Sequence, residues 1–315
     1  MNNFDEMMDL VGPQPLRKVA VAVGQDSAVI QAAAGAIERN VAETVLVGDE
    51  KQIRRIAESV GVDLAASRVT VVDEPNALRA VAAAVAMVSS GQADILMKGY
   101  VHTDDFLRGV LDKAHGLRTG SIMSHVFIAE VRDPDKLLFI TDAAMNIAPT
   151  LDQKASILLN AVFLAQHFGV PDPKVAILGA VELVNPAMPA TVDAAVLAKM
   201  ADRHQYLPGC TVDGPFALDN AVSPAAAEHK RITGPVAGVA DILLVPTIEA
   251  GNILAKSLVY LGGRRLIGLL VGATAPVVLT SRADTAECKM LSMAGAVLMV
   301  NMKRELKLKI GKVRY

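Results

Sequence analysis

The sequence contains few cysteines, few aromatic side chains and no tryptophan. Of 315 residues only Cys210 and Cys288 are cysteines, and aromatic residues make up 3%. Two cysteines are too few for a disulfide framework or for a four-ligand zinc site. The six histidines include no pair at helical spacing. We therefore expect no metal site, and we expect the two thiols to stay reduced in a cytoplasmic protein.

A charge surplus and a long apolar run are also missing. The 31 basic and 33 acidic residues nearly cancel, which argues against a general nucleic-acid binder. The mean hydropathy of +0.37 is high. However, the uncharged run Leu266–Ser281 is broken by Gly272 and Pro276 and is shorter than the roughly 20 apolar residues of a spanning helix. The first residues have no apolar stretch, so we expect neither a secretory signal nor a membrane contact.

Short β-branched runs alternate with longer alanine-rich amphipathic stretches along the chain. This alternation predicts an α/β fold with mostly parallel sheets flanked by helices. The length exceeds what one core usually supports, so two domains are expected. The predicted strands cover 18–24, 43–49, 69–73, 93–99, 137–142, 174–180, 210–214, 241–246 and 265–272. The predicted helices cover 27–39, 50–61, 76–90, 150–168, 189–202, 249–261 and 284–298, and Thr150 is placed to cap the fourth.

The strongest candidate site follows a strand near the end of the chain. Ligands of open parallel sheets bind beyond the carboxyl ends of the strands. In PVVLTSRADTAECK (276–289), a strand leads to Ser281 and Arg282 at the expected start of a helix, with Asp284 and Glu287 in its first turn. A hydroxyl, a guanidinium and free backbone N–H groups suit a phosphate or an oxyanion. The alternative is a capping box of Ser281 and Asp284 without a ligand.

A second candidate region covers residues 97–127. A basic residue ends a strand, Thr103 can cap the following helix, and a loop rich in glycine and hydroxyl groups follows. Such a loop can cradle phosphate, although neither a Walker A spacing nor a GxGxxG fingerprint is present. The candidates for binding here are Lys98, Arg108, Arg118, Thr119 and Ser124.

Three further runs place polar side chains near strand ends, and each is commonplace alone. Their candidate binding residues are Asp142, Asn146, Asp213 and Asn252. The basic stretch 303–315 is expected to be a solvated tail or an edge strand rather than a contact for coenzyme A.

Several long segments carry a resemblance through essentially the whole chain from about residue 16. They include MKGYVHTDDFLRGVL, GLRTGSIMSHV, TDAAMNIAPTLDQK, VDGPFALDNA and VLTSRADTAE. Together they resemble the phosphate acyltransferase family of phosphotransacetylases and phosphotransbutyrylases. The segments SRAD, TDAAMNIAPT and VNPAMPAT resemble those of the butyryltransferases more closely than those of the acetyltransferases.

The resemblance implies reversible acyl transfer between coenzyme A and inorganic phosphate, with both as substrates and no tightly bound cofactor. It also implies a homodimer and a two-domain fold like that of isocitrate and isopropylmalate dehydrogenases, with the active site in an interdomain cleft. We assign residues 1–145 plus 285–315 to the first α/β domain and residues 146–284 to the second.

The family's serine–arginine pair corresponds to Ser281 and Arg282. In the family, the serine assists the thioester or the leaving sulfur and the arginine holds phosphate. Phosphotransacetylases carry an aspartate seven residues past that serine, where this sequence has Cys288. Either Asp284 or Glu287 is then the substitute base, or the base role is filled differently. We assign Ser281, Arg282 and Asp284 to catalysis. A packed Cys288 is favoured over a covalent role.

The predicted function is transfer of a butyryl or similar short acyl group by direct attack of phosphate on the thioester. Arg282, with Arg108 or Arg118, would clamp the phosphate. A phosphate acetyltransferase is the alternative within the class. Two alternatives come from other classes, an NAD(P)-dependent hydroxy-acid dehydrogenase and a non-catalytic acyl-CoA-binding module.

Overall fold

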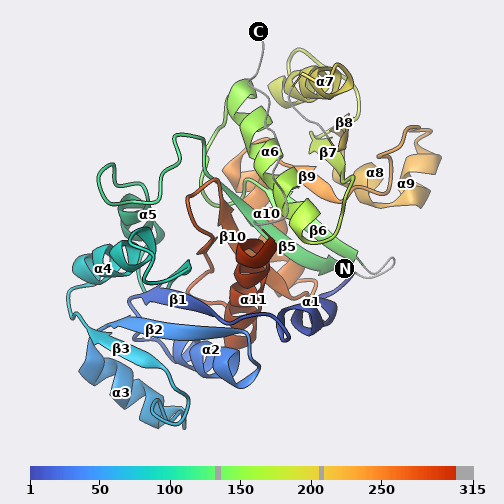
Figure 1. Cartoon of the computed structure of the whole chain (residues 1–315). Helices are drawn as coiled ribbons and strands as arrows, with labels where there is room; N and C mark the ends of the chain where they lie inside the picture. The colour runs from blue at the N-terminus through green and yellow to red at the C-terminus, as the bar shows by residue number, and fades with distance from the viewer. Residues whose placement is uncertain (132–135, 206–208, 303–315) are drawn as a thin grey trace. The chain divides into compact units, whose positions relative to one another are not determined.

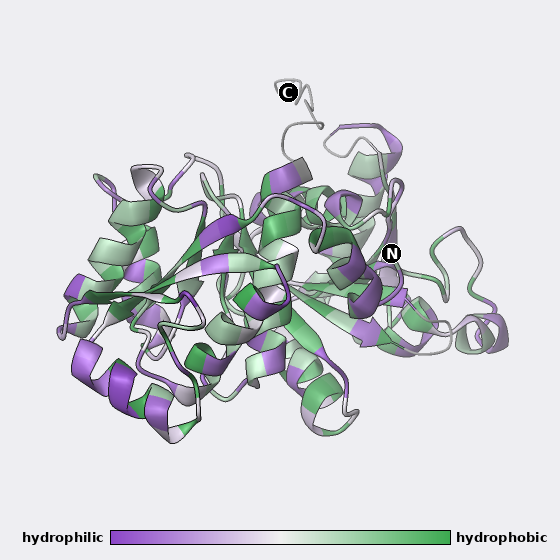
Figure 2. Cartoon of the chain, turned by 60° about the horizontal axis from the view of Figure 1, so that its bottom comes forward, coloured by the Kyte–Doolittle hydropathy of each residue, from purple (hydrophilic) through white to green (hydrophobic). Residues whose placement is uncertain are grey.

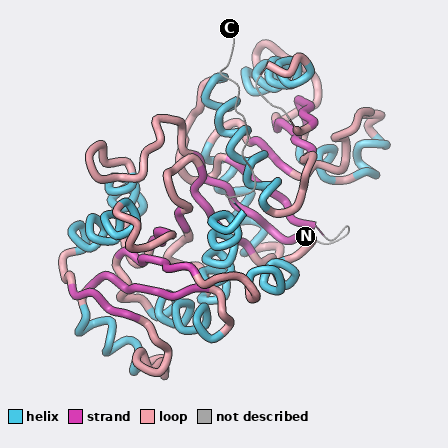
Figure 3. Tube along the Cα trace, in the orientation of Figure 1, coloured by secondary structure: helices cyan, strands magenta, loops and turns pink. Residues whose placement is uncertain are grey.

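The computed structural model describes residues 1–131, 136–205 and 209–302. Backbone contacts divide the chain into two compact units. One, here called the terminal unit, contains Phe4–Ser121 and the described chain from Ile267 onward. The other, the central unit, contains Ile122–Leu266 with the first three residues. Figure 1 traces both units in chain order, and Figure 3 shows helices and strands alternating along the chain.

The terminal unit is built on one half of the sheet, whose strands run in the order β3-β2-β1-β4-β11-β10. Neighbouring strands are parallel except β10 and β11, which are antiparallel. Its elements are α1 (Phe4–Val11), β1 (Arg17–Ala22), α2 (Ser27–Glu38), β2 (Ala42–Gly48), α3 (Glu50–Ser59), β3 (Thr70–Asp73), α4 (Ala77–Ser89), β4 (Ile95–Lys98), α5 (Thr103–Val110), β10 (Leu266–Val271), β11 (Val277–Val278) and α11 (Ala286–Met302).

The central unit is built on strands in the order β5-β6-β9-β7-β8. The pair β5 and β6 is antiparallel, and the other neighbours are parallel. Its elements are β5 (Ser124–Val131), β6 (Lys136–Thr141), α6 (Leu151–His167), β7 (Lys174–Leu178), α7 (Pro189–Asp202), β8 (Thr211–Phe216), α8 (Leu218–Val222), α9 (Pro224–His229), β9 (Ile242–Leu244) and α10 (Ile248–Tyr260).

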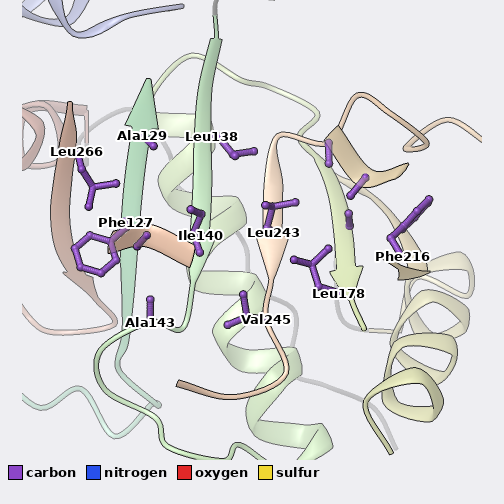
Figure 4. Close-up of a cluster of buried hydrophobic side chains, with 14 of the residues drawn as sticks. Phe127, Ala129, Leu138, Ile140, Ala143, Leu178, Phe216, Leu243, Val245 and Leu266 are labelled. Carbon is purple, nitrogen blue, oxygen red and sulfur yellow. The ribbon is translucent and has the colours of Figure 1, made fainter. Parts of the chain in front are cut away.

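Apolar strands covered by helices explain both cores. All four residues of β4 are buried, as are all six of β10, which is the pattern of sheets covered on both faces. In the central unit the buried side chains of Phe127, Ile140 and Leu243 belong to one cluster (Figure 4). The helices are banded in polar and apolar residues (Figure 2) because one stripe packs on the sheet and the other faces water.

Side chains at the helix starts set where the helices begin. Asp26, Asp49 and Asn76 each accept a hydrogen bond from a backbone N–H in the first turn of α2, α3 and α4. Thr150 caps α6 as predicted, with Gln153 completing a capping box. Each such cap stabilises its helix by about 1 kcal/mol.

The chain order produces a switch point in the terminal unit. The chain runs from β1 outward to β2 and β3, and then returns to place β4 on the other side of β1. The carboxyl ends of β1 and β4 therefore diverge into different connections, which is where open α/β sheets bind ligands. The two strand ends are tied together, because Gly99 N–H donates to Ala22 and Tyr100 N–H donates to Val23.

The predicted fold class is confirmed, and the nine predicted strands and seven predicted helices all occur near their expected positions. The sequence analysis missed α1, β5, α8 and α9. The strand that it expected before Ser281 is the short β11. The predicted loop around 116–124 ends earlier than expected, since Ser124 begins β5. Backbone contacts place the changes between the two units at residues 121 and 266, and the predicted domain boundaries stay a prediction. Within the described residues, no helix is long and apolar enough to cross a membrane.

Gly99 lies where β4 meets the end of β1, and a side chain has no room there. A Cβ on Gly99 would collide with the carbonyl oxygen of Val23 and come within 2.6 Å of that of Ala22. Backbone atoms cannot move aside cheaply, so Gly99→Ala should lower the free energy of unfolding by at least about 1–3 kcal/mol. Urea unfolding followed by circular dichroism measures this change.

Gly35 provides the matched control within α2. A Cβ there would meet only the sulfur of Met290, at an ordinary 3.5 Å. Gly35→Ala should raise the free energy of unfolding by about 0.4–1 kcal/mol, since alanine has the higher helix propensity. Equal stability of the two variants would contradict the close approach at Gly99.

Candidate active site

Three parallel strand ends bring the polar residues of the terminal unit together. Ala22 at the end of β1 pairs in register with Lys98 at the end of β4, and Val278 of β11 pairs with Met97. The segments that leave these strands carry Asp26, Tyr100 and the Ser281–Asp284 turn. We call Lys98, Lys289, Arg282, Asp284 and Asp26 the strand-end cluster, because the last four are the charges that act on Lys98.

Lys98 is a nearly fully buried cation, with 2% of its surface exposed. Its one hydrogen bond within the described residues is a long one, 3.4 Å from Nζ to the Gly99 carbonyl oxygen. Burial first, and the positive charges of Lys289 and Arg282 second, lower the pKa of Lys98 to about 8. Asp284 and Asp26 act in the opposite direction. The ammonium group is thus held at the strand end at a considerable electrostatic cost.

Lys289 is the second buried cation, and the sequence analysis missed it. It lies in α11, is 2% exposed, and donates from Nζ to the Ser281 carbonyl oxygen at 2.7 Å. Burial lowers its pKa as well. One signal was available, because Lys289 is followed directly by the buried apolar residues Met290 and Leu291 of α11. A lysine on such a face is rarely accidental.

The Ser281–Asp284 segment forms a turn rather than the start of a helix. Ser281 N–H donates to Asp284 Oδ2 at 2.7 Å, and Ala283 N–H donates to Ser281 Oγ at 3.3 Å. The helix α11 begins only at Ala286, and Thr285 Oγ1 accepts from Cys288 N–H at its start. The predicted capping role of Ser281 is therefore wrong, as is the placement of Asp284 in the first helical turn.

Arg282 lies on the exposed side of this turn, with its guanidinium carbon 5.9 Å from the centre of the Tyr100 ring. A cation over an aromatic face is attracted to it at this separation. The contact links the turn after β11 to the segment after β4. It leaves the planar guanidinium exposed, so a ligand can reach it. Lys98 and Lys289 belong to the same cluster of charges but are buried.

Arg108 forms its ion pair within its own helix, α5. Its side chain is 72% exposed and pairs with Asp105 at 3.0 Å on α5. Thr103 does not cap α5, because His102 is the N-cap residue and makes no side-chain cap bond. Among the described residues, hydrogen bonds and ion pairs join Arg108 to no member of the strand-end cluster, and its predicted binding role stays a prediction.

Arg118 and Thr119 belong to a link between two loops of the terminal unit. Thr119 Oγ1 donates to the Gly272 carbonyl oxygen at 2.7 Å, and Arg118 forms an isolated bridge with Ala273. Both side chains are exposed. Their predicted roles in phosphate or coenzyme A binding stay predictions.

In the central unit, Asp142 organises the turn after β6. Its buried carboxylate accepts backbone N–H bonds from His125, Ala144 and Met145 at 2.9–3.1 Å, and a further bond from the Asn146 amide. Asn146 also donates to the Met123 carbonyl oxygen at 2.9 Å. Within the described residues, the hydrogen bonds of this carboxylate come from the protein's own backbone and from one amide side chain, which indicates a structural role for Asp142.

Ser124 and Asn252 are tied down in the same way. Ser124 Oγ accepts from Asn160 Nδ2 at 2.9 Å and is fully buried. Asn252, on α10, donates to the Ala143 carbonyl oxygen at 3.1 Å. Both therefore adjoin the turn that Asp142 organises.

Asp213 stands apart, inside the edge strand β8, where a strand over 210–214 was predicted. Its Oδ1 accepts from Gly214 N–H at 2.8 Å, and burial raises the pKa of its carboxyl group. Two strands, β9 and β7, separate β8 from β6 and hence from Asp142. The basic stretch 303–315 lies outside the described residues. In the described part of the chain, no group of three or more histidine, cysteine or acidic residues could hold a metal ion.

Comparison with known proteins identifies the class. Residues 5–80 and 69–297 match the family described as phosphate acetyl/butaryl transferase. The chain belongs to this family of phosphate acyltransferases.

Individual relatives agree with the family. Phosphate butyryltransferase of Clostridium beijerinckii is 51% identical over 94% of this chain and 97% of its own length. Phosphate acetyltransferase of Thermotoga maritima is 46% identical over 88% of this chain and 93% of its own. A crystal structure of a branched-chain phosphotransacylase from Enterococcus faecalis V583 superposes with a TM-score of 0.78 at 34% identity, covering 90% of this chain and 99% of the other.

Asp142→Ala tests the structural role of that carboxylate. The change removes the acceptor of three backbone N–H groups, of which that of His125 is buried, and one of the two acceptors of the Asn146 amide. This loss should lower the free energy of unfolding by about 3 kcal/mol. Denaturant unfolding measures the loss. Asp213→Ala removes the single hydrogen bond from Gly214 N–H and should lower the free energy of unfolding clearly less. Equal losses for the two variants would contradict the assignment.

Proposed function

We propose that the protein transfers a butyryl or similar short acyl group reversibly between coenzyme A and inorganic phosphate, with the strand-end cluster as its phosphate site. The family membership supports acyl transfer to phosphate. The observation that carries the site is the convergence of Arg282 with buried Lys98 and Lys289 at a sheet switch point. A doubly charged nucleophile needs such fixed positive charge.

The reaction divides into attack and departure. A phosphate oxygen forms a bond to the thioester carbon, and the carbonyl electrons move to oxygen to give a tetrahedral oxyanion. The oxyanion then collapses, the C–S bond breaks, and coenzyme A leaves as its thiolate with the electron pair of that bond. A thiolate leaves readily, so positioning of phosphate and stabilisation of the oxyanion are the main tasks.

The residues of the turn divide these tasks. Arg282 presents a planar, permanently charged fork suited to two phosphate oxygens. Ser281 Oγ accepts a hydrogen bond from Ala283 N–H at 3.3 Å, and it assists the oxyanion or the sulfur. Asp284 accepts the Ser281 N–H and fixes the turn, and it is the base for the thiol in the reverse direction.

The acyl group is the finer part of the proposal. Relatives named for butyryl and for acetyl transfer are similarly close, at 51% and 46% identity. One methylene in an apolar pocket changes discrimination by about 1–3 kcal/mol. A panel from acetyl- to hexanoyl-CoA decides between the two, with the highest kcat/KM expected for butyryl-CoA. Homodimeric assembly and a cytoplasmic location stay predictions from the sequence.

The proposed function is tested by following the loss of butyryl-CoA with and without phosphate. Turnover should require phosphate. Arg282→Ala should raise KM for phosphate about 10- to 100-fold, because a charge-assisted contact is lost, and should leave KM for butyryl-CoA nearly unchanged. Lys51→Ala on exposed α3 is the control and should behave as the wild type. Phosphate-independent loss of butyryl-CoA would rule the proposal out.

Cys288 separates direct attack from a covalent route. Direct attack predicts that Cys288→Ala keeps kcat within about threefold of the wild type, because the thiol then takes no part in the bond changes. Steady-state kinetics with butyryl-CoA and phosphate measure this. A loss of several orders of magnitude, together with exchange of labelled coenzyme A into butyryl-CoA without phosphate, would establish an acyl-cysteine instead.

A further inference from the structure

The two buried lysines of the strand-end cluster lack the partners that buried lysines ordinarily have. Lys98 and Lys289 are each 2% exposed. Their hydrogen bonds within the described residues go to one backbone carbonyl each, Gly99 and Ser281. Neither forms an ion pair with a carboxylate in that part of the chain. Each ammonium group has three N–H donors, so most of this donor capacity has no protein acceptor.

Lys154 in the central unit shows the ordinary arrangement. It is also buried, at 6% exposure, but its Nζ lies 2.7 Å from Asp193 Oδ2. The same chain therefore pairs the buried Lys154 with a carboxylate, whereas Lys98 and Lys289 have no carboxylate partner in the described residues. Burying unpaired charge costs several kcal/mol, and natural proteins accept such a cost mainly at functional sites.

The charges around Lys98 sum to an excess of positive charge. Three cations, Lys98, Lys289 and Arg282, face two carboxylates, Asp284 and Asp26. Both carboxylates already accept backbone N–H bonds, from Ser281 and Val29 respectively. The arrangement is complete only when an anion joins it. A small phosphate dianion fits buried ammonium groups better than the phosphates of a bulky nucleotide do.

We propose that Lys98 and Lys289 form a positioning pair for the phosphate nucleophile that becomes fully charged only when phosphate binds, so that phosphate binding takes up a proton. The inference rests on the proposed function and extends it to two residues and a proton. Lys289 also holds the Ser281 carbonyl, so the pair connects the bound anion to the turn that carries Ser281 and Arg282.

The sign of the pH dependence follows from Lys98. Its pKa of about 8 in the unliganded protein reflects burial first and the neighbouring cations second. A bound dianion favours the charged ammonium and raises that pKa. By linkage, phosphate affinity is fully present below pH 8 and declines as the pH rises through about 8 and above. Asp26 and Asp284 act on both lysines, and Cys288 faces Lys289. The Tyr100 ring lies beside Arg282.

Calorimetric titration of the full chain with inorganic phosphate at pH 8 tests the inference. Running it in two buffers of different ionisation enthalpy gives the number of protons taken up. The wild type should take up about half a proton more than Lys98→Met, since about half of Lys98 is uncharged at its pKa. Lys98→Met and Lys289→Met should each weaken phosphate binding about 10- to 100-fold. Lys98→Arg should restore affinity without the proton uptake.

Thermal unfolding keeps the test independent of folding defects. Lys98→Met should unfold at or above the wild-type temperature, because it removes an unpaired buried charge. The matched control Lys154→Met leaves Asp193 without its partner, and it should unfold at a lower temperature while binding phosphate normally. Titration with coenzyme A separates the two possible phosphate sources, and its affinity should be unchanged in Lys98→Met.

Wild-type phosphate affinity and proton uptake in Lys98→Met would overturn the inference, as would a loss confined to coenzyme A. These outcomes leave the proposed function intact, provided that the wild type consumes butyryl-CoA only with phosphate. Absence of that turnover would instead refute the proposed function.

Discussion

Two ammonium groups buried at the carboxyl edge of one sheet are the constraint on which the site depends. Lys98 and Lys289 are each 2% exposed, and within the described residues neither forms an ion pair with a carboxylate. A sheet edge can hold them because backbone carbonyls and the opposed carboxylates of Asp284 and Asp26 partly offset the desolvation. The fold supplies the position through the switch between β1 and β4, and the glycine at 99 allows the two strand ends to meet.

In the central unit, by contrast, the buried polar side chains are hydrogen-bonded to the protein itself. Asp142 accepts three backbone N–H bonds and one amide, and Ser124 and Asn252 are each bonded to neighbouring segments. Saturated networks of this kind fix a turn but leave little capacity for a ligand. The contrast with the strand-end cluster is physical, because a binding site needs donors that the protein itself does not satisfy.

Much of the fold was predictable, because apolar β-branched runs separated by glycine and acidic residues can form little else than buried parallel strands. β5 was missed because a loop rich in glycine and hydroxyl groups leads into it. Ser281 and Arg282 were found because they directly follow an apolar strand. Lys289 was missed although the apolar residues that follow it, Met290 and Leu291, indicated a buried helix face. The pairing of Arg108 with Asp105 on α5 could not be read from the sequence.

A crystal structure of the protein with inorganic phosphate tests the assignment of the site most directly. The predicted result is one phosphate within hydrogen-bond distance of the Arg282 guanidinium and of the Lys98 ammonium group, with the Ser281 turn unchanged. Phosphate bound instead at the Asp142 turn or beside Arg108, with the strand-end cluster empty at saturating concentration, would contradict it.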